Sequence, residues 1–214
     1  MTGYRPVSGW AVASLIAGLG SAAVLFTPLA MVVPLVAVAL AVAALRDLGR
    51  GEGRTIGRPL ALAGLALSIG FAAQAAAAAV TARVIAGQRA STAATTWLDA
   101  VREDRLTDAT GLCNPLILPG RGRPPEPELS PEEQLEAFAA LPAVQAVASC
   151  GQTAPVLIET RPVQVGASAW LVRADVAACG GTTTVVRLVV EPRAVRRRDS
   201  SLERWLVQEM TVEP

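Results

Sequence analysis

A stretch without any charged side chain, Pro6 to Leu45, constrains this chain more than any other feature. As a helix rising about 1.5 Å per residue, its 40 residues would measure roughly 60 Å, which is two crossings of a hydrocarbon core about 30 Å thick. Pro28 near its middle favours a turn there, because proline disfavours helix in the residue before it. A second uncharged run, Pro59 to Ala82, follows the Arg-rich loop 46–58.

These two runs predict three membrane-spanning helices in residues 1–82, with spans at about 9–26, 28–45 and 59–82. The mean hydropathy of +0.43 and a hydrophobic content of 52% agree with a membrane protein and exceed those of ordinary soluble domains. A cleaved signal peptide with its apolar core at Ser8 to Phe26 is the competing interpretation. The apolar run does not stop where cleavage should occur, which favours the anchor.

The arginines near the span ends predict the orientation of the anchor. Five lie in the N-terminal head and in loop 46–58, whereas Arg83, Arg89 and Arg102 follow the third span. Because Lys and Arg concentrate in cytoplasmic loops, the head and the loop are expected in the cytoplasm. An odd number of spans then makes residues 83–214 extracytoplasmic, and predicts a multi-pass protein of a bacterial inner membrane, with the lipid bilayer as its first partner.

The C-terminal part is close to neutral, which argues against nucleic acid as a partner. It carries 14 Arg and 16 acidic residues, while the whole chain has a net charge of +1. The chain has no His, which removes the commonest metal ligand and the usual general base near neutral pH. The sequence therefore predicts no metal and no cofactor.

Three cysteines, Cys113, Cys150 and Cys179, all lie in the C-terminal part, and none forms a C-x-x-C pair. In an extracytoplasmic domain one disulfide and one free thiol are expected. A hairpin near Gly166 would bring Cys179 close to residue 154, so the favoured disulfide is Cys150–Cys179. Cys113–Cys150 is the alternative pairing, and three buried reduced thiols are the alternative without a disulfide.

The sequence of the extracytoplasmic part, residues 83–214, predicts helices followed by strands. Apolar spacing indicates a helix over 86–104, which continues the third span, and a short one over 106–112. A proline-rich loop precedes Ser130-Pro131-Glu132-Glu133, a capping box that opens a helix ending before Pro142. After this helix the apolar residues recur at every second position. That alternation predicts four strands: 156–165, 168–178, 182–190 and 203–212. We therefore expect an α+β domain, with helices packed on one face of a curved antiparallel sheet.

The sequence also resembles two known families. The segments PVSGWAVASL, LFTPL, ALRDLGRG and GRPLALAGLALS resemble a bacterial membrane family catalogued as domain of unknown function 4190, over about residues 5–80. That resemblance implies a membrane-embedded module and no enzymatic activity. The segments TTWLDAVREDRLTDAT and ERWLVQE resemble the cone-shaped nuclear-transport-factor-2-like fold (SnoaL-like, cystatin-like), over about 88–213.

The cone-shaped fold implies an internal pocket, and Trp97, Trp170 and Trp205 are its candidate lining residues, an aromatic core being their alternative role. No catalytic residue is predicted, and the favoured function is a non-catalytic module that binds an envelope protein or a small ligand. The first alternative is an isomerase or cyclase of the SnoaL-like type with a buried aspartate as base, the candidates being Asp99, Asp108 and Asp175. The second alternative is an envelope sensor or assembly subunit.

Overall fold

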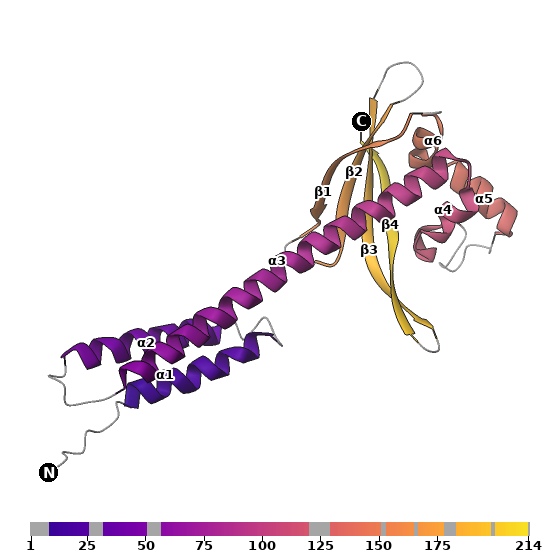
Figure 1. The fold of residues 1–214 in the computed structure, drawn as a ribbon. Helices are drawn as coiled ribbons and strands as arrows, with labels where there is room; N and C mark the ends of the chain where they lie inside the picture. Colours follow the sequence, from indigo (N-terminus) through magenta and orange to yellow (C-terminus); the bar gives the residue numbers. More distant parts are fainter. Residues whose placement is uncertain are drawn as a thin grey trace, which may run out of the picture. The chain divides into compact units, whose positions relative to one another are not determined.

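The computed structural model describes residues 9–25, 32–50, 57–119, 129–150, 153–164, 167–177, 183–197 and 200–213. It divides into two compact units, Met1–Arg83 and Val84–Pro214. One helix, α3 (Arg58–Arg102), contributes residues to both units (Figure 1). The predicted continuation of the third apolar run into the helix of the second unit is therefore confirmed.

The first unit contains α1 (Gly9–Gly20), the 3-10 helix η1 (Ser21–Leu25), α2 (Val32–Arg50) and the beginning of α3. The three α-helices meet at a cluster of buried alanines, one from each helix: Ala11, Ala44 and Ala61. Helices α1 and α3 approach each other at Gly18 and Gly64, where an added Cβ atom on Gly18 would lie 2.6 Å from the Gly64 carbonyl oxygen. Small residues thus set the spacing between these two helices.

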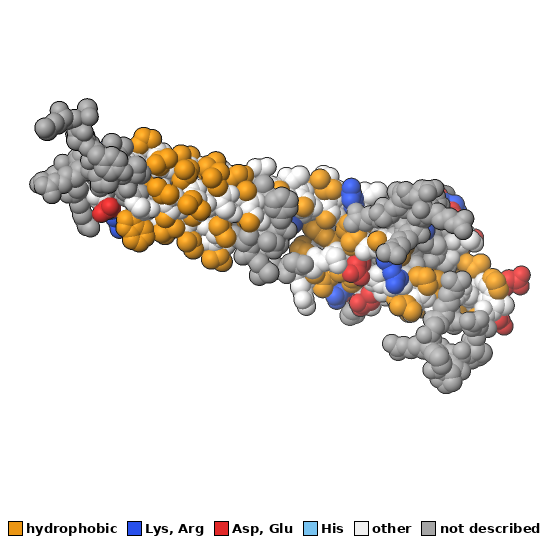
Figure 2. All heavy atoms as spheres, turned by 90° about the horizontal axis from the view of Figure 1, so that it is seen from below, with side chains coloured by type: hydrophobic (Ala, Val, Ile, Leu, Met, Phe, Trp, Pro, Cys, Tyr) orange, Lys and Arg blue, Asp and Glu red, His pale blue; other side chains and the backbone are white. Residues whose placement is uncertain are grey.

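Large apolar side chains of the first unit point outward rather than into this interface. Leu35 is 70% exposed and Ile16 is 65% exposed, whereas Ser14 and Ser68 are fully buried. Figure 2 shows hydrophobic side chains covering the visible face of this unit. A water-soluble helical bundle has the opposite arrangement, with leucine and isoleucine inside and polar residues outside.

Among the described residues, one helix is long and apolar enough to cross a membrane, and it is α3. The apolar helical segment Gly9–Val24 is shorter. The sequence predicted three spans, whereas the described residues contain one candidate. The α-helical part of α1 has only 12 residues, about 18 Å. In α2, Arg46 and Asp47 restrict the uncharged part to the residues before them.

The second unit carries a four-stranded antiparallel sheet in the order β1-β2-β3-β4. Its strands are β1 (Val156–Pro162), β2 (Trp170–Ala177), β3 (Thr183–Arg197) and β4 (Ser200–Glu213). The predicted α+β class with four strands is confirmed. Strand β3 runs seven residues past the predicted end at 190, and β4 begins before the predicted 203. Residues 191–197 pair with residues 200–206, so the antiparallel pairing extends beyond the predicted strands.

The remaining helices are α4 (Leu106–Gly111), the 3-10 helix η3 (Pro115–Ile117), α5 (Pro131–Ala139) and α6 (Pro142–Ala148). Helix α3 ends where Asp104 adopts a left-handed φ of 57°, and the Arg105 N–H closes the last turn on the Ala100 carbonyl at 2.8 Å. The predicted capping box is present at the start of α5. Helix α6 was not predicted; Pro142 occupies its first turn, where proline is well tolerated.

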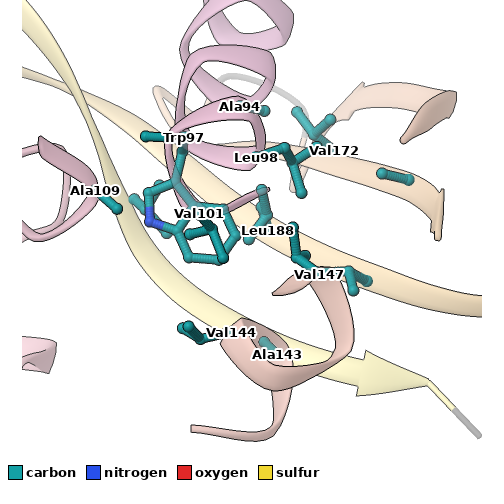
Figure 3. Close-up of a cluster of buried hydrophobic side chains, with 14 of the residues drawn as sticks. Ala94, Trp97, Leu98, Val101, Ala109, Ala143, Val144, Val147, Val172 and Leu188 are labelled. Carbon is teal, nitrogen blue, oxygen red and sulfur yellow. The ribbon is translucent and has the colours of Figure 1, made fainter. Parts of the chain in front are cut away.

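The core of the second unit lies between α3 and one face of the sheet. Val172 of β2 and Leu188 of β3 face Leu98 and Val101 of α3, and all four side chains are buried. Trp97 fills the space between α3 and helices α4 and α6, where Ala109 and Val144 are its neighbours in the cluster (Figure 3). The space between helices and sheet is therefore filled by side chains at this end of the domain.

Candidate functional site

The three predicted pocket-lining tryptophans lie in different surroundings. Trp97 is fully buried in the core, and Trp170 is 8% exposed and packs against α3 at Gly87. Trp205 of β4 is partly buried and lines an open pocket on the surface. Trp205 thus lines a surface pocket outside the core rather than the inside of a cone.

The three candidate catalytic aspartates do not converge on a common cavity. Asp99 lies 3.3 Å from Arg102 on the same helix, and Asp108 lies 2.8 Å from Arg105. Asp175 is half-buried on β2, in register with Val185 of β3. Within the ranges that the structure describes, no carboxylate is fully buried. Among the described residues, Asp99, Asp108 and Asp175 are therefore not paired with one another.

The cysteines are only partly described. Cys113 is a free, buried thiol that donates to the Ala109 carbonyl at 3.4 Å, so it is not joined to Cys150. Burial raises the pKa of the Cys113 thiol to about 12, and the nearby Trp97 indole N–H offsets part of that rise. Cys150 is buried at the end of α6. The favoured disulfide Cys150–Cys179 involves Cys179, which lies outside the described residues.

A pocket of about 740 Å³ lies between α3 and β4 of the second unit. We call it the α3–β4 groove, and its lining residues are Ile85, Gln88, Arg89, Thr92, Ala93, Arg204 and Trp205. Residues on α3 at positions 85, 88, 89 and 92 share one helix face, because side chains three and four apart are neighbours. The Trp205 indole nitrogen is buried and has no hydrogen-bond partner within the described part of the chain.

A second hollow, of about 320 Å³, lies further along α3 beside α4. Thr96, Ala100 and Leu112 are among its lining residues, and Arg204 lines it as well as the α3–β4 groove. Asp108, the acidic residue that lines this hollow, is paired with Arg105. Arg204 is the charged residue that lines both hollows. Arg204 and Arg89 are the charged residues among the described lining of the α3–β4 groove.

A buried asparagine, Asn114, which was not predicted as a functional residue, holds the part of β4 around Val207 in place. Asn114 follows a short parallel bridge between Cys113 and Val207, and its backbone N–H donates to the Val207 carbonyl at 2.8 Å. Its Oδ1 accepts hydrogen bonds from Arg193 at 2.9 Å and from the Leu116 N–H at 3.2 Å. Asn114 thereby fixes the strand segment that presents Arg204 and Trp205.

No family model, curated protein or solved structure matches this chain. The two resemblances noted from the sequence therefore stay predictions. Among the described residues no group of three His, Cys, Asp or Glu side chains is placed to hold a metal ion. The α3–β4 groove combines apolar walls from Ile85 and Trp205 with the cationic Arg204.

Proposed function

We propose that this protein is a membrane-anchored, non-catalytic binding module whose α+β domain recognises its ligand or partner at the α3–β4 groove. The single observation that carries the proposal is the inverted burial of the first unit. There, small residues such as Ala11, Ser14 and Ser68 are fully buried, whereas the large side chains of Ile16, Leu35 and Ile69 are more than half exposed. Lipid is the solvent in which that arrangement is stable, since apolar side chains are indifferent to burial against each other or against acyl chains.

The anchor comprises all three helices of the first unit, with spans near the predicted 9–26, 28–45 and 59–82. The backbone approach at Gly18 and Gly64 supports this proposal, because close packing through small residues holds helices together in lipid. The short α-helical part of α1 would then require local thinning of the bilayer around it, or continuation of the span through η1. The arginine distribution favours the extracytoplasmic side for the α+β domain.

Binding is favoured over catalysis because the chemistry needed for a reaction is not assembled. Asp99 and Asp108 are engaged with arginines, and the inner space of the domain is occupied by Trp97 and its neighbours. An open surface groove that combines apolar walls with a cation suits recognition of a ligand. An envelope sensor would use the same groove, with the continuous helix α3 as the element that both units share.

Site-specific photocrosslinking in living cells tests the proposal. We expect p-benzoylphenylalanine placed at Gln88, an exposed residue of the groove, to give a discrete adduct of the full-length protein. The matched control is the same probe at Thr211, an exposed residue of β4 that does not line the groove. Equal adduct patterns at both positions, or none at either, would contradict a binding role for the groove.

A further inference from the structure

No described carboxylate compensates the charge of Arg204, in contrast to the charges of Arg105 and Arg173. Arg105 contacts Glu103 and Asp108, at 2.9 and 2.8 Å, and Arg173 contacts Glu159 at 3.3 Å and also Glu213. Arg204 makes no ion pair with any residue that the structure describes. An exposed guanidinium without a carboxylate partner is free to bind an anion from outside the chain.

Neighbouring positive charge strengthens the potential at Arg204. Arg193 of β3 stands directly opposite Arg204 in the β3–β4 register, and its guanidinium is held by Asn114. Arg89 lines the other wall of the groove, on α3. No described carboxylate lines the groove, so its field favours a negatively charged occupant.

The occupant must also offer apolar surface, because Ile85, Ala93 and Trp205 line the same groove. Ile85 follows Ala82, the last residue of the third apolar run, by only three residues. If the first unit is embedded in lipid, chain connectivity alone keeps the beginning of the groove within a few residues of the bilayer surface. An anionic phospholipid is the negatively charged amphiphile that a bilayer supplies at its surface.

We propose that the α3–β4 groove binds an anionic phospholipid of the membrane in which the protein is anchored. The phosphate contacts Arg204, and part of an acyl chain lies against Ile85, Ala93 and Trp205. A volume of about 740 Å³ is within the range of small-molecule sites and holds a headgroup with part of a chain. This inference rests on the proposed membrane anchoring, and it names the ligand class of the proposed binding site.

Photoaffinity labelling of the full-length protein in lipid nanodiscs tests this inference. The nanodiscs contain phosphatidylcholine and a trace of phosphatidylglycerol with a diazirine in one acyl chain, and the crosslinked sites are read from tryptic peptides. We expect labelled peptides 84–89 and 90–102, which carry the α3 wall of the groove. Removing the charge–phosphate contact with Arg204→Gln should lower their labelling about tenfold.

Three controls make the result specific. Arg161→Gln removes an exposed arginine of β1 that is paired with Glu159 at 2.8 Å, and it should leave the labelling unchanged. Thr92→Trp, which fills the groove from α3, should abolish the labelling. A phosphatidylcholine probe with the same diazirine chain should label the two peptides about tenfold less than phosphatidylglycerol does, because it lacks net negative charge.

Several outcomes would overturn the inference. They are undiminished labelling in Arg204→Gln, equal labelling by the two lipid probes, or labelling confined to peptides before residue 84. Displacement of the Gln88 photocrosslink by an acidic peptide, with no lipid labelling of the groove, would assign the site to a protein partner instead. Each of these results leaves the anchoring intact if the protein still resists alkaline carbonate extraction, so failure of the lipid site and failure of the anchor are distinguishable.

Discussion

The indole of Trp170 lies against the backbone of α3 at Gly87, where an added Cβ atom would be only 3.0 Å from ring atom Cζ3 and 3.2 Å from Cη2. Trp170 opens β2, so this contact joins the helix to the sheet. Glycine at position 87 lets a bulky ring approach the helix axis without a side chain between them. The position of α3 on the sheet, and therefore the wall of the groove that follows at Gln88, depends on this close approach.

Substituting Gly87 should therefore destabilise the second unit. Gly87→Val is expected to lower the free energy of unfolding by about 1–3 kcal/mol, because an overpacked site must displace the Trp170 ring. Thermal unfolding of the detergent-solubilised protein measures the loss. In a Trp170→Leu background the same substitution should have a much smaller effect, and an undiminished penalty there would show that the ring is not the cause.

The contact between α1 and α3 should tolerate an added side chain even less than the contact at Gly87 does. A Cβ atom on Gly64 would lie 2.5 Å from the Ser14 carbonyl oxygen, and backbone cannot rotate away as a side chain can. Gly64→Val is expected to separate the two helices and lower the melting temperature in detergent. Gly70→Val on the same helix, where nothing lies within 4 Å, is the matched control. Equal melting temperatures of the two variants would contradict the helix contact.

The buried Cys113 thiol predicts an alkaline loss of stability. Its pKa is about 12 in the folded protein, compared with an ordinary value of 9.0, so the folded state keeps its proton over a range in which the unfolded chain loses it. The unfolded state then binds fewer protons, and stability falls with rising pH by up to about 1.4 kcal/mol per pH unit between pH 9 and 12. Below pH 9 the thiol makes no difference to the slope.

Denaturant unfolding of the wild type and of Cys113→Ala at pH 8 and pH 10.5 measures this effect. The stability difference between the two proteins should shrink at the higher pH, because alanine has no proton to lose. An unchanged difference would mean that the thiol is not held neutral by its surroundings. Maleimide labelling of Cys113 should likewise require denaturation.

Opposite sides of the membrane are predicted for Asp47 and Thr211. Both residues are exposed: Asp47 lies near the end of α2, within the Arg-rich segment 46–58, and Thr211 lies on β4. A membrane-impermeant maleimide should label Thr211→Cys in intact spheroplasts, and should label Asp47→Cys only after permeabilisation. Wild-type protein is the control, because it shows how much label the native cysteines take up on their own. The reverse pattern would place the α+β domain in the cytoplasm.

Local signals allowed much of the α+β fold to be predicted from the sequence. The capping box needs only residues 130–133, and both of its hydrogen bonds are present: the Ser130 N–H donates to Glu133 at 2.8 Å and the Glu133 N–H donates to the Ser130 hydroxyl at 3.3 Å. The strands were recognisable because alternating β-branched residues reflect a sheet with one buried face. The long hairpin arm of β3 was missed because its residues Arg193–Arg197 carry no apolar alternation.

The groove could not be predicted, because it depends on pairing between distant parts of the chain. Residues 85–93 of α3 and 204–205 of β4 are more than a hundred positions apart, and nothing in either segment shows that they meet. Asn114 likewise looks like an ordinary loop residue before a proline in the sequence. Only the fold brings Arg193 of β3 and Gln208 of β4 beside it. Trp205 was singled out as aromatic, but its neighbour Arg204 carries the charge of the groove.

Carbene labelling of the first unit from within the bilayer tests the central claim most directly. A small apolar diazirine partitioned into membranes that contain the full-length protein should label the outward-facing Ile16, Leu35 and Ile69, with the sites read by mass spectrometry. The inward-facing Ala11, Ala44 and Ala61 should stay unlabelled. Labelling of both sets alike, or of neither, would contradict a helical bundle whose large apolar side chains face lipid.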